Sequence, residues 1–140
     1  MLLLAAVQIA FLLLVGRLVF AVPLGGNLPA VLVTLLVFAW VAAALGVLAG
    51  STVASEDRVV GLCVLASLLM AALDGCWWPL ELAPAWLRTA AHALPTGWAM
   101  DALHQLISFG AGWAAVVKPL SVLAALGAAF TWLATRAFRV

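Results

Sequence analysis

Residues 28–50 form a run of mostly apolar side chains without a single charge. At 1.5 Å per residue, a helix of this length is able to cross the hydrocarbon core of a bilayer, which is about 30 Å thick. The whole chain has the same character, since 69% of its residues are apolar and 8% are charged. Soluble domains are about half apolar and about a quarter charged. The sequence therefore predicts an all-helical (all-α) integral membrane protein with a single transmembrane domain.

Four segments are expected to cross the membrane. We therefore expect a multi-pass protein of a cell membrane, in contact with the membrane lipids. The expected spans are roughly residues 2–22, 28–50, 59–73 and 113–134. The third is too short to cross alone by about a turn and a half of helix. It has to gain length from Arg58, whose long side chain reaches toward the headgroups, or to continue past Asp74.

Small residues recur at every fourth position of the second expected span, at Ala42, Gly46 and Gly50. They form a stripe on one face of the helix, where another helix is able to approach closely. The pattern predicts a packed bundle, but it is common to membrane proteins of many functions.

Residues 74–109 interrupt the regular spans. They contain both histidines, and Pro79, Pro84 and Pro95 divide them into pieces too short to cross a bilayer. We expect a re-entrant or interfacial hairpin of two short helices, roughly residues 84–94 and 98–109, with Thr96 capping the second. Backbone that breaks at membrane depth must be buried in protein or line a water-filled cavity. The hairpin is therefore expected at the mouth of a pathway.

The candidate functional residues are the acids, aromatics and helix-breaking residues of this hairpin. They are Asp74, Trp77, Trp78, Pro79, Glu81, Pro84, Trp86, Pro95, Thr96, Trp98 and Asp101. Asp74 either lines a pathway or is an interfacial acid paired with a basic or backbone group. Asp101 and His104 are three residues apart, so their side chains are able to hydrogen-bond on one face of a helix. The alternative is that this face is simply exposed to solvent.

The sequence carries no motif for chemistry of its own. It lacks a phosphate-binding loop, a G-x-S-x-G elbow and an H-E-x-x-H zinc motif. His92, His104, Cys76 and Asp74 do not have the spacing of a metal site. We therefore expect no catalytic, cofactor-binding or metal-binding residue, and no enzyme. An intramembrane hydrolase that pairs Ser51 or Ser67 with a histidine is a remote alternative, and no spacing supports it. The net charge of +1 indicates no nucleic-acid partner.

Two motifs of the hairpin give the sequence a family resemblance. They are WWPLELAPAWLR at residues 77–88 and LPTGWAMDAL at residues 94–103. Together they closely resemble the permease subunits of type-2 ATP-binding-cassette exporters, where such a pair lies between the last two spans. FAVPLGG at residues 20–26 and GVLAGSTVASED at residues 46–57 are similar to a turn and a cytoplasmic loop of that family.

The resemblance implies a transport function without catalysis in this chain. The chain would form the translocation pathway with a second permease half, as a homodimer or heterodimer. A separate ATP-binding subunit would drive transport, so that ATP is bound by the partner. The hairpin would be extracytoplasmic, and the loop at residues 51–58 and the C-terminus would be cytoplasmic. Charge alone leaves the orientation open, because three basic residues fall on each side.

The expected number of spans differs from the family pattern. The family has six spans and this chain about four, so the sequence resembles the C-terminal portion of a permease, without the cytoplasmic helix that contacts the ATPase. Either an upstream part is missing from the sequence or the gene is truncated. The alternative function is therefore a truncated, non-transporting membrane protein or an assembly partner.

Replacing both Asp74 and Glu81 by alanine is expected to impair export, because carboxylates at a pathway mouth interact with what passes. Export and the amount of protein in the membrane are measured together for the double variant and the wild type. Wild-type export by the double variant at normal expression would remove both carboxylates from such a role.

Overall fold

The computed structural model describes residues 2–21, 26–52, 55–73 and 84–137. Within them the secondary structure is helical, which confirms the prediction of an all-α chain. The six helices are α1 (Leu2–Leu18), α2 (Leu28–Thr52), α3 (Glu56–Leu73), α4 (Ala85–Ala91), α5 (Pro95–Ile107) and α6 (Trp113–Ala137). Helices occupy much of each of the four expected spans.

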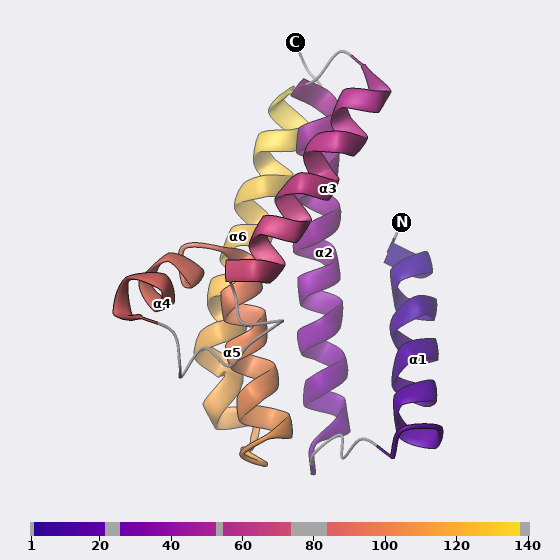
Figure 1. Ribbon diagram of the computed structural model, residues 1–140, viewed down its shortest axis with the longest axis vertical. Coiled ribbons are helices and arrows are strands. Elements are labelled where there is room, and N and C mark those ends of the chain that lie inside the picture. The colour runs from indigo at the N-terminus through magenta and orange to yellow at the C-terminus, as the bar shows by residue number, and fades with distance from the viewer. Residues whose placement is uncertain (1, 22–25, 53–54, 74–83, 138–140) are drawn as a thin grey trace.

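Three helices, α2, α5 and α6, form the packed centre of the molecule (Figure 1). The long helices α2 and α6 run side by side in the same direction, and the shorter α5 runs opposite to them and packs against both at one end of the bundle. Two clusters of buried side chains hold them together. The first is Ala30, Val31, Ala102, Leu106 and Val116, and the second is Val41, Ala99 and Leu123.

Gly127 of α6 packs closely against the Trp40 ring of α2. A Cβ atom added there would lie 3.0 Å from two ring carbons of Trp40, which is tighter than most real contacts. The stripe of small residues on α2 does not contact another helix in this way at its glycines. Gly46 and Gly50 are exposed, and a Cβ atom on either would meet nothing within 4 Å. The prediction of a packed bundle is correct, but within this chain α2 contacts α6 through a large side chain of α2 and a glycine of α6.

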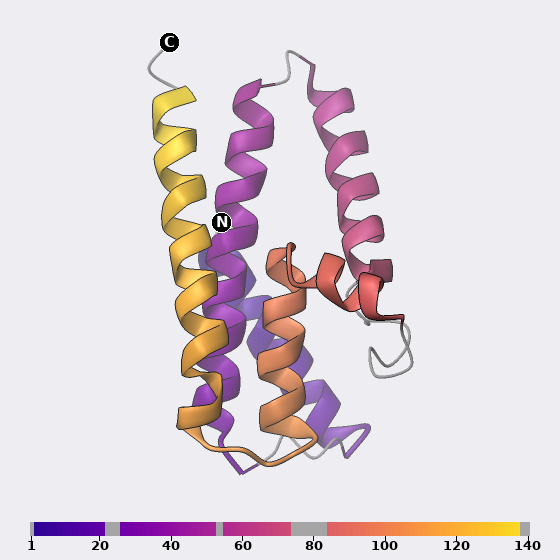
Figure 2. The same ribbon diagram turned by 90° about the vertical axis from the view of Figure 1, so that its left-hand side faces the viewer.

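The helices α1 and α3 lie at the periphery. No residue of α1 is buried, and most side chains of α3 are exposed. Figure 2 shows α3 beside one half of α2 and α5 beside the other half, with α4 lying across at about the level where they meet. Because α3 ends at Leu73, near the middle of the bundle, it does not by itself run the length of α2.

By length and apolar composition, two of the described helices are able to cross a membrane, at residues 28–51 and 113–137. The apolar helix α1 is shorter. The count of four spans and the re-entrant nature of the hairpin therefore stay predictions.

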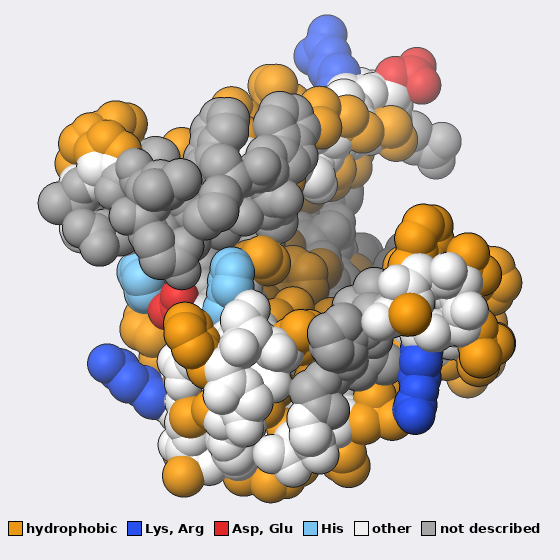
Figure 3. Space-filling model, turned by 60° about the horizontal axis from the view of Figure 1, so that its bottom comes forward, with side chains coloured by type: hydrophobic (Ala, Val, Ile, Leu, Met, Phe, Trp, Pro, Cys, Tyr) orange, Lys and Arg blue, Asp and Glu red, His pale blue; other side chains and the backbone are white. Residues whose placement is uncertain are grey.

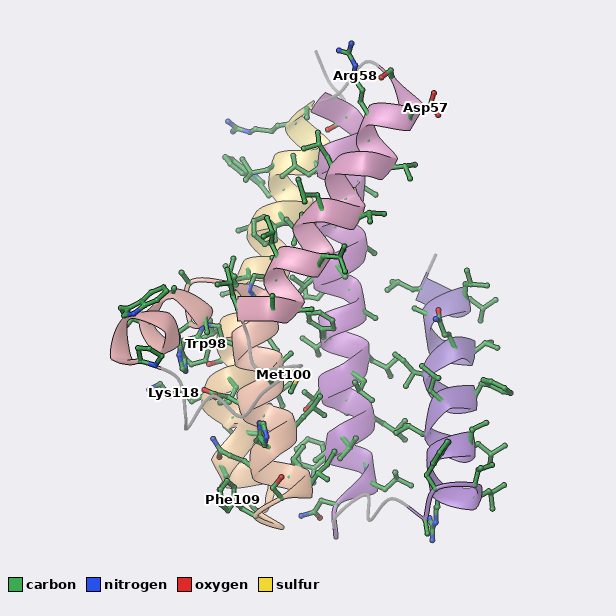
Figure 4. All side chains as sticks on the ribbon, viewed as in Figure 1. Asp57, Arg58, Trp98, Met100, Phe109 and Lys118 are labelled. Atoms are coloured by element: carbon green, nitrogen blue, oxygen red, sulfur yellow. The ribbon has the colours of Figure 1, made fainter. Side chains whose placement is uncertain are left out.

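Helix α2 has no charged side chain, and several of the charged residues of the other helices lie at the ends of the bundle. Asp57 and Arg58 are at one end and Phe109 is at the other (Figure 4). At the Phe109 end, the side-chain amide of Asn27 donates a hydrogen bond to the carbonyl oxygen of Ala111, at 3.3 Å. This contact joins the segment before α2 to the segment before α6.

Replacing Gly127 by valine is expected to lower the free energy of unfolding in detergent by about 1–3 kcal/mol, the usual cost of overpacking a tight interface. The extra carbon atoms would overlap the Trp40 ring and push α2 and α6 apart. The matched control is Gly61→Val on α3, where an added Cβ meets nothing within 4 Å. Equal stability of the two variants, by titration with a denaturing detergent, would contradict this account of the interface.

Candidate functional site

The corner between α4 and α5 is the most polar feature at the centre of the described bundle. Trp98, just after the corner, packs against the cluster of Val41, Ala99 and Leu123. Val41 and Leu123 each lie near the middle of a 25-residue helix. The corner therefore lies at about half the height of the molecule, as Figures 1 and 2 show. The sequence predicted a hairpin at one membrane face, and in the structure α5 extends from this level to the end of the bundle.

Hydrogen bonds close the backbone at this corner. The N–H groups of Ala93 and Leu94 donate to the carbonyl oxygens of Ala90 and Ala91, each at 3.0 Å. The indole Nε1–H of Trp98 donates to the carbonyl oxygen of His92 at 2.8 Å. The last carbonyls of a helix have no partner within it, and these bonds supply partners at the end of α4.

The start of α5 shows that the prediction of Thr96 as the capping residue is wrong. Helix α5 begins at Pro95, and Leu94 is the N-cap residue, without a side-chain hydrogen bond. Proline suits the first helical position because it has no N–H to satisfy and its φ is already helical. Thr96 is therefore inside the helix and does not cap it. Its Oγ1 atom is buried and has no hydrogen-bond partner in the described structure.

Gly97 permits the close approach of the two helices at the corner. A Cβ atom at this position would overlap the carbonyl oxygen of Ala91. Because the overlapping atom belongs to the backbone, no rotation of a side chain relieves it. A residue larger than glycine therefore requires α4 and α5 to separate.

A side-chain hydrogen bond joins the two sides of the corner. His92 Nε2 and Asp101 Oδ2 are 2.6 Å apart, with the side chains 39% and 35% exposed. The His92 ring also meets the Trp98 ring edge-on, at 5.0 Å between centroids. The sequence suggested His104 as a partner for Asp101, and the structure places His92 beside the carboxylate, on the other side of the corner.

A cation from α6 completes the cluster. Lys118 Nζ lies 5.9 Å from the centroid of the Trp98 ring (Figure 4), within the range of a cation–π contact. Trp98 thereby connects all three helices, since it donates to the end of α4, lies on α5 and faces a cation of α6. We call His92, Trp98, Asp101 and Lys118 the corner cluster.

The structure places six of the eleven predicted site residues. Pro95, Thr96, Trp98 and Asp101 come together at the corner, whereas Pro84 and Trp86 are exposed at the start of α4. The remaining five lie outside the described residues and stay predictions. They are Asp74, Trp77, Trp78, Pro79 and Glu81.

Three residues of the corner were not among the predicted site residues: His92, Gly97 and Lys118. A glycine two positions after a helix-starting proline was a usable signal for a tight corner, but the contacts of His92 and Lys118 depend on the packing of separate helices. Within the described ranges no group of three or more histidine, cysteine, aspartate or glutamate side chains is placed to hold a metal ion.

Comparison with known proteins gives a family match over most of the chain. Residues 1–136 match the family described as ABC-2 family transporter protein. The linearmycin resistance permease protein LnrN of Bacillus subtilis (strain 168) is 27% identical over 103 residues. The matched region covers 74% of this chain and 27% of LnrN, so the chain corresponds to about a quarter of that protein's length. No solved structure matches.

Replacing Gly97 by alanine is expected to destabilise the protein by about 1–3 kcal/mol, although alanine favours helices over glycine by up to about 1 kcal/mol. The sign of the change in unfolding free energy is informative, because helix propensity favours alanine and the overlap with Ala91 disfavours it. The control is Gly16→Ala on α1, where an added Cβ meets nothing within 4 Å and a slight gain is expected. A gain in unfolding free energy for both variants would show that the corner is looser than described.

Proposed function

The chain belongs to the ABC-2 family of transporter proteins, and we propose that it forms part of the membrane-spanning permease of an ATP-binding-cassette exporter. The observation that carries the proposal is the family match over residues 1–136, nearly the whole chain. The membrane domain of this family is non-catalytic. The sequence has no phosphate-binding loop, so we assign ATP hydrolysis to a separate subunit.

In this proposal α1, α2, α3 and α6 cross the membrane, and α4 and α5 form a re-entrant hairpin. The position of the hairpin within the bundle supports this assignment. Helix α5 packs along α6, and the corner that precedes it is closed by its own hydrogen bonds. A chain break at membrane depth is tolerated where its polar groups are satisfied or face a water-filled cavity. We place the C-terminus in the cytoplasm and the Phe109 end outside.

A second permease half is the partner that we propose for the exposed helices. The side chains of α1 include no buried residue, and those of α3 are mostly exposed. Lipid is able to cover such surfaces, but an exporter needs a pathway between two halves. Because the match covers about a quarter of LnrN, the further spans and the contact with the ATPase are assigned to segments or chains beyond the residues matched here.

The substrate that we propose is a compound whose removal confers resistance. The basis is the name of LnrN, which refers to resistance to linearmycin. In the described residues, the corner cluster brings charged and titratable side chains to about half the height of the bundle. They are therefore able to contact polar parts of a substrate at that depth.

The test is whether the chain associates with an ATP-binding subunit and supports export. We expect the tagged protein, purified from its own membranes in mild detergent, to bring down an ATP-binding-cassette ATPase. We also expect deletion of the gene to raise cellular accumulation of an exported compound, with recovery on re-expression. A control strain lacking only the ATPase should show the same accumulation.

The competing function is a non-transporting membrane protein or assembly partner, and the same experiment separates the two. Absence of an ATPase from the purified protein, together with unchanged accumulation in the deletion strain, would contradict the exporter function.

A further inference from the structure

One face of α5 carries a stripe of polar side chains. Asp101, His104, Gln105 and Ser108 follow one another at helical spacing, and all are half-buried or exposed. The opposite face, with Ala99, Ala102 and Leu106, is buried against the bundle. The helix therefore separates an apolar side, which packs on α2 and α6, from a polar side that these helices leave uncovered.

The polar stripe extends from one end of the bundle to its middle. Ser108 follows the last residue of α5, at the Phe109 end, and Asp101 is hydrogen-bonded to His92 at the corner. Figure 3, which brings this end forward, shows histidine side chains and an acidic side chain beside a hollow in the surface. Polar and ionisable side chains at this depth are costly in contact with lipid. A line of them is stable where water reaches it.

At the inner end of the stripe, a hydrogen bond joins the imidazole of His92 to the carboxylate of Asp101, and both are groups that bind and release protons. An imidazolium and a carboxylate form a charge-assisted bond, which is stronger than the bond between a neutral imidazole and a carboxylate. Histidine is the side chain that ordinarily changes charge between pH 5 and 8. Because His92 follows α4 and Asp101 is in α5, the strength of this bond affects how firmly the two helices are held together.

Other charged or titratable groups lie on the elements around this pair. On α5 the titratable neighbour is His104, and on α6 the cation is Lys118, held over Trp98. The sequence of α2 has no ionisable side chain, and the charged residues of α3 are Glu56, Asp57 and Arg58, in its first turn at the far end of the bundle. The sequence of α4 includes Arg88, and residues 74–83 include Asp74 and Glu81.

We propose that the polar face of α5 lines a water-filled vestibule, open at the Phe109 end, and that the His92–Asp101 pair at its inner end is a proton-binding site that latches α4 to α5. The ligand is the hydrated proton. This inference rests on the membrane-spanning function proposed above. Protonation of His92 tightens the latch, and loss of that proton as the pH rises loosens it.

The vestibule is tested by the accessibility of single cysteines in sealed vesicles. Cys63 and Cys76 are first replaced by serine, and one cysteine is introduced by Gln105→Cys or Ser108→Cys. A charged, membrane-impermeant thiol reagent reacts with the thiolate, which forms in water. We expect both positions to react at least about tenfold faster than Leu65→Cys, an exposed position on the apolar helix α3. Equal rates at all three positions would overturn the vestibule.

The latch is tested by the distance between spin labels on α4 and α6. The labels are attached through Trp86→Cys and Ser121→Cys, both exposed positions. Cys63 and Cys76 are again replaced by serine, so that only these two positions are labelled. With no other change, we expect the distance distribution to shift to longer values or broaden from about pH 6 to about pH 8. The matched variant is His92→Gln, which keeps a hydrogen-bonding side chain that does not titrate, and its distribution should be the same at both pH values.

Two outcomes would overturn the latch: a distribution that does not depend on pH in the unchanged protein, or the same pH-dependent shift in His92→Gln. Circular dichroism and gel filtration at both pH values show whether each variant is folded. The outcome does not depend on the ATPase, so failure of the latch is distinguishable from failure of the exporter function. The latter is read from co-purification and accumulation.

Discussion

The structure depends on satisfying the polar backbone where α4 turns into α5. This corner lies at about half the height of the bundle, and a backbone carbonyl that is shielded from water there costs several kcal/mol if it is left unpaired. Trp98 contributes most directly, because its indole N–H binds the carbonyl of His92. Pro95 removes one donor that would otherwise need a partner, and Gly97 allows the two helices to come close enough for these contacts.

Packing of α2, α5 and α6 holds this corner in place. In lipid, hydrophobic burial gives little drive for helices to associate, since the lipid tails are as apolar as leucine. Close fit between side chains has to supply the stability instead. Small residues at the contacts, such as Ala30, Ala102 and Gly127, let the backbones approach, and Trp40 covers the glycine. Among the described residues, α1 has no buried side chain and most side chains of α3 are exposed, so these two helices present most of their apolar surface outward.

Sequence reasoning located most of the elements because the signals were local. Long apolar runs marked α2 and α6, and the prolines marked the short helices between Leu73 and Trp113. It was wrong where a helix start had two candidates: Thr96 is a good capping residue, but Pro95 at the first helical position places the cap at Leu94. Within this chain the stripe of small residues on α2 is exposed, because such a stripe indicates that a face is able to pack, not which partner covers it.

The sequence by itself determined the class of the protein. Its composition requires a membrane, its charge-free runs require helices, and the paired motifs of the hairpin indicate the ABC-2 family, which the match over residues 1–136 confirms. Only the tertiary structure decided the depth of the corner and the partners within it. His92 and Asp101 meet at 2.6 Å, and Lys118 faces Trp98, because α4, α5 and α6 pack in one particular arrangement. Local sequence does not encode such contacts, since each joins side chains whose separation is set by the packing of separate helices.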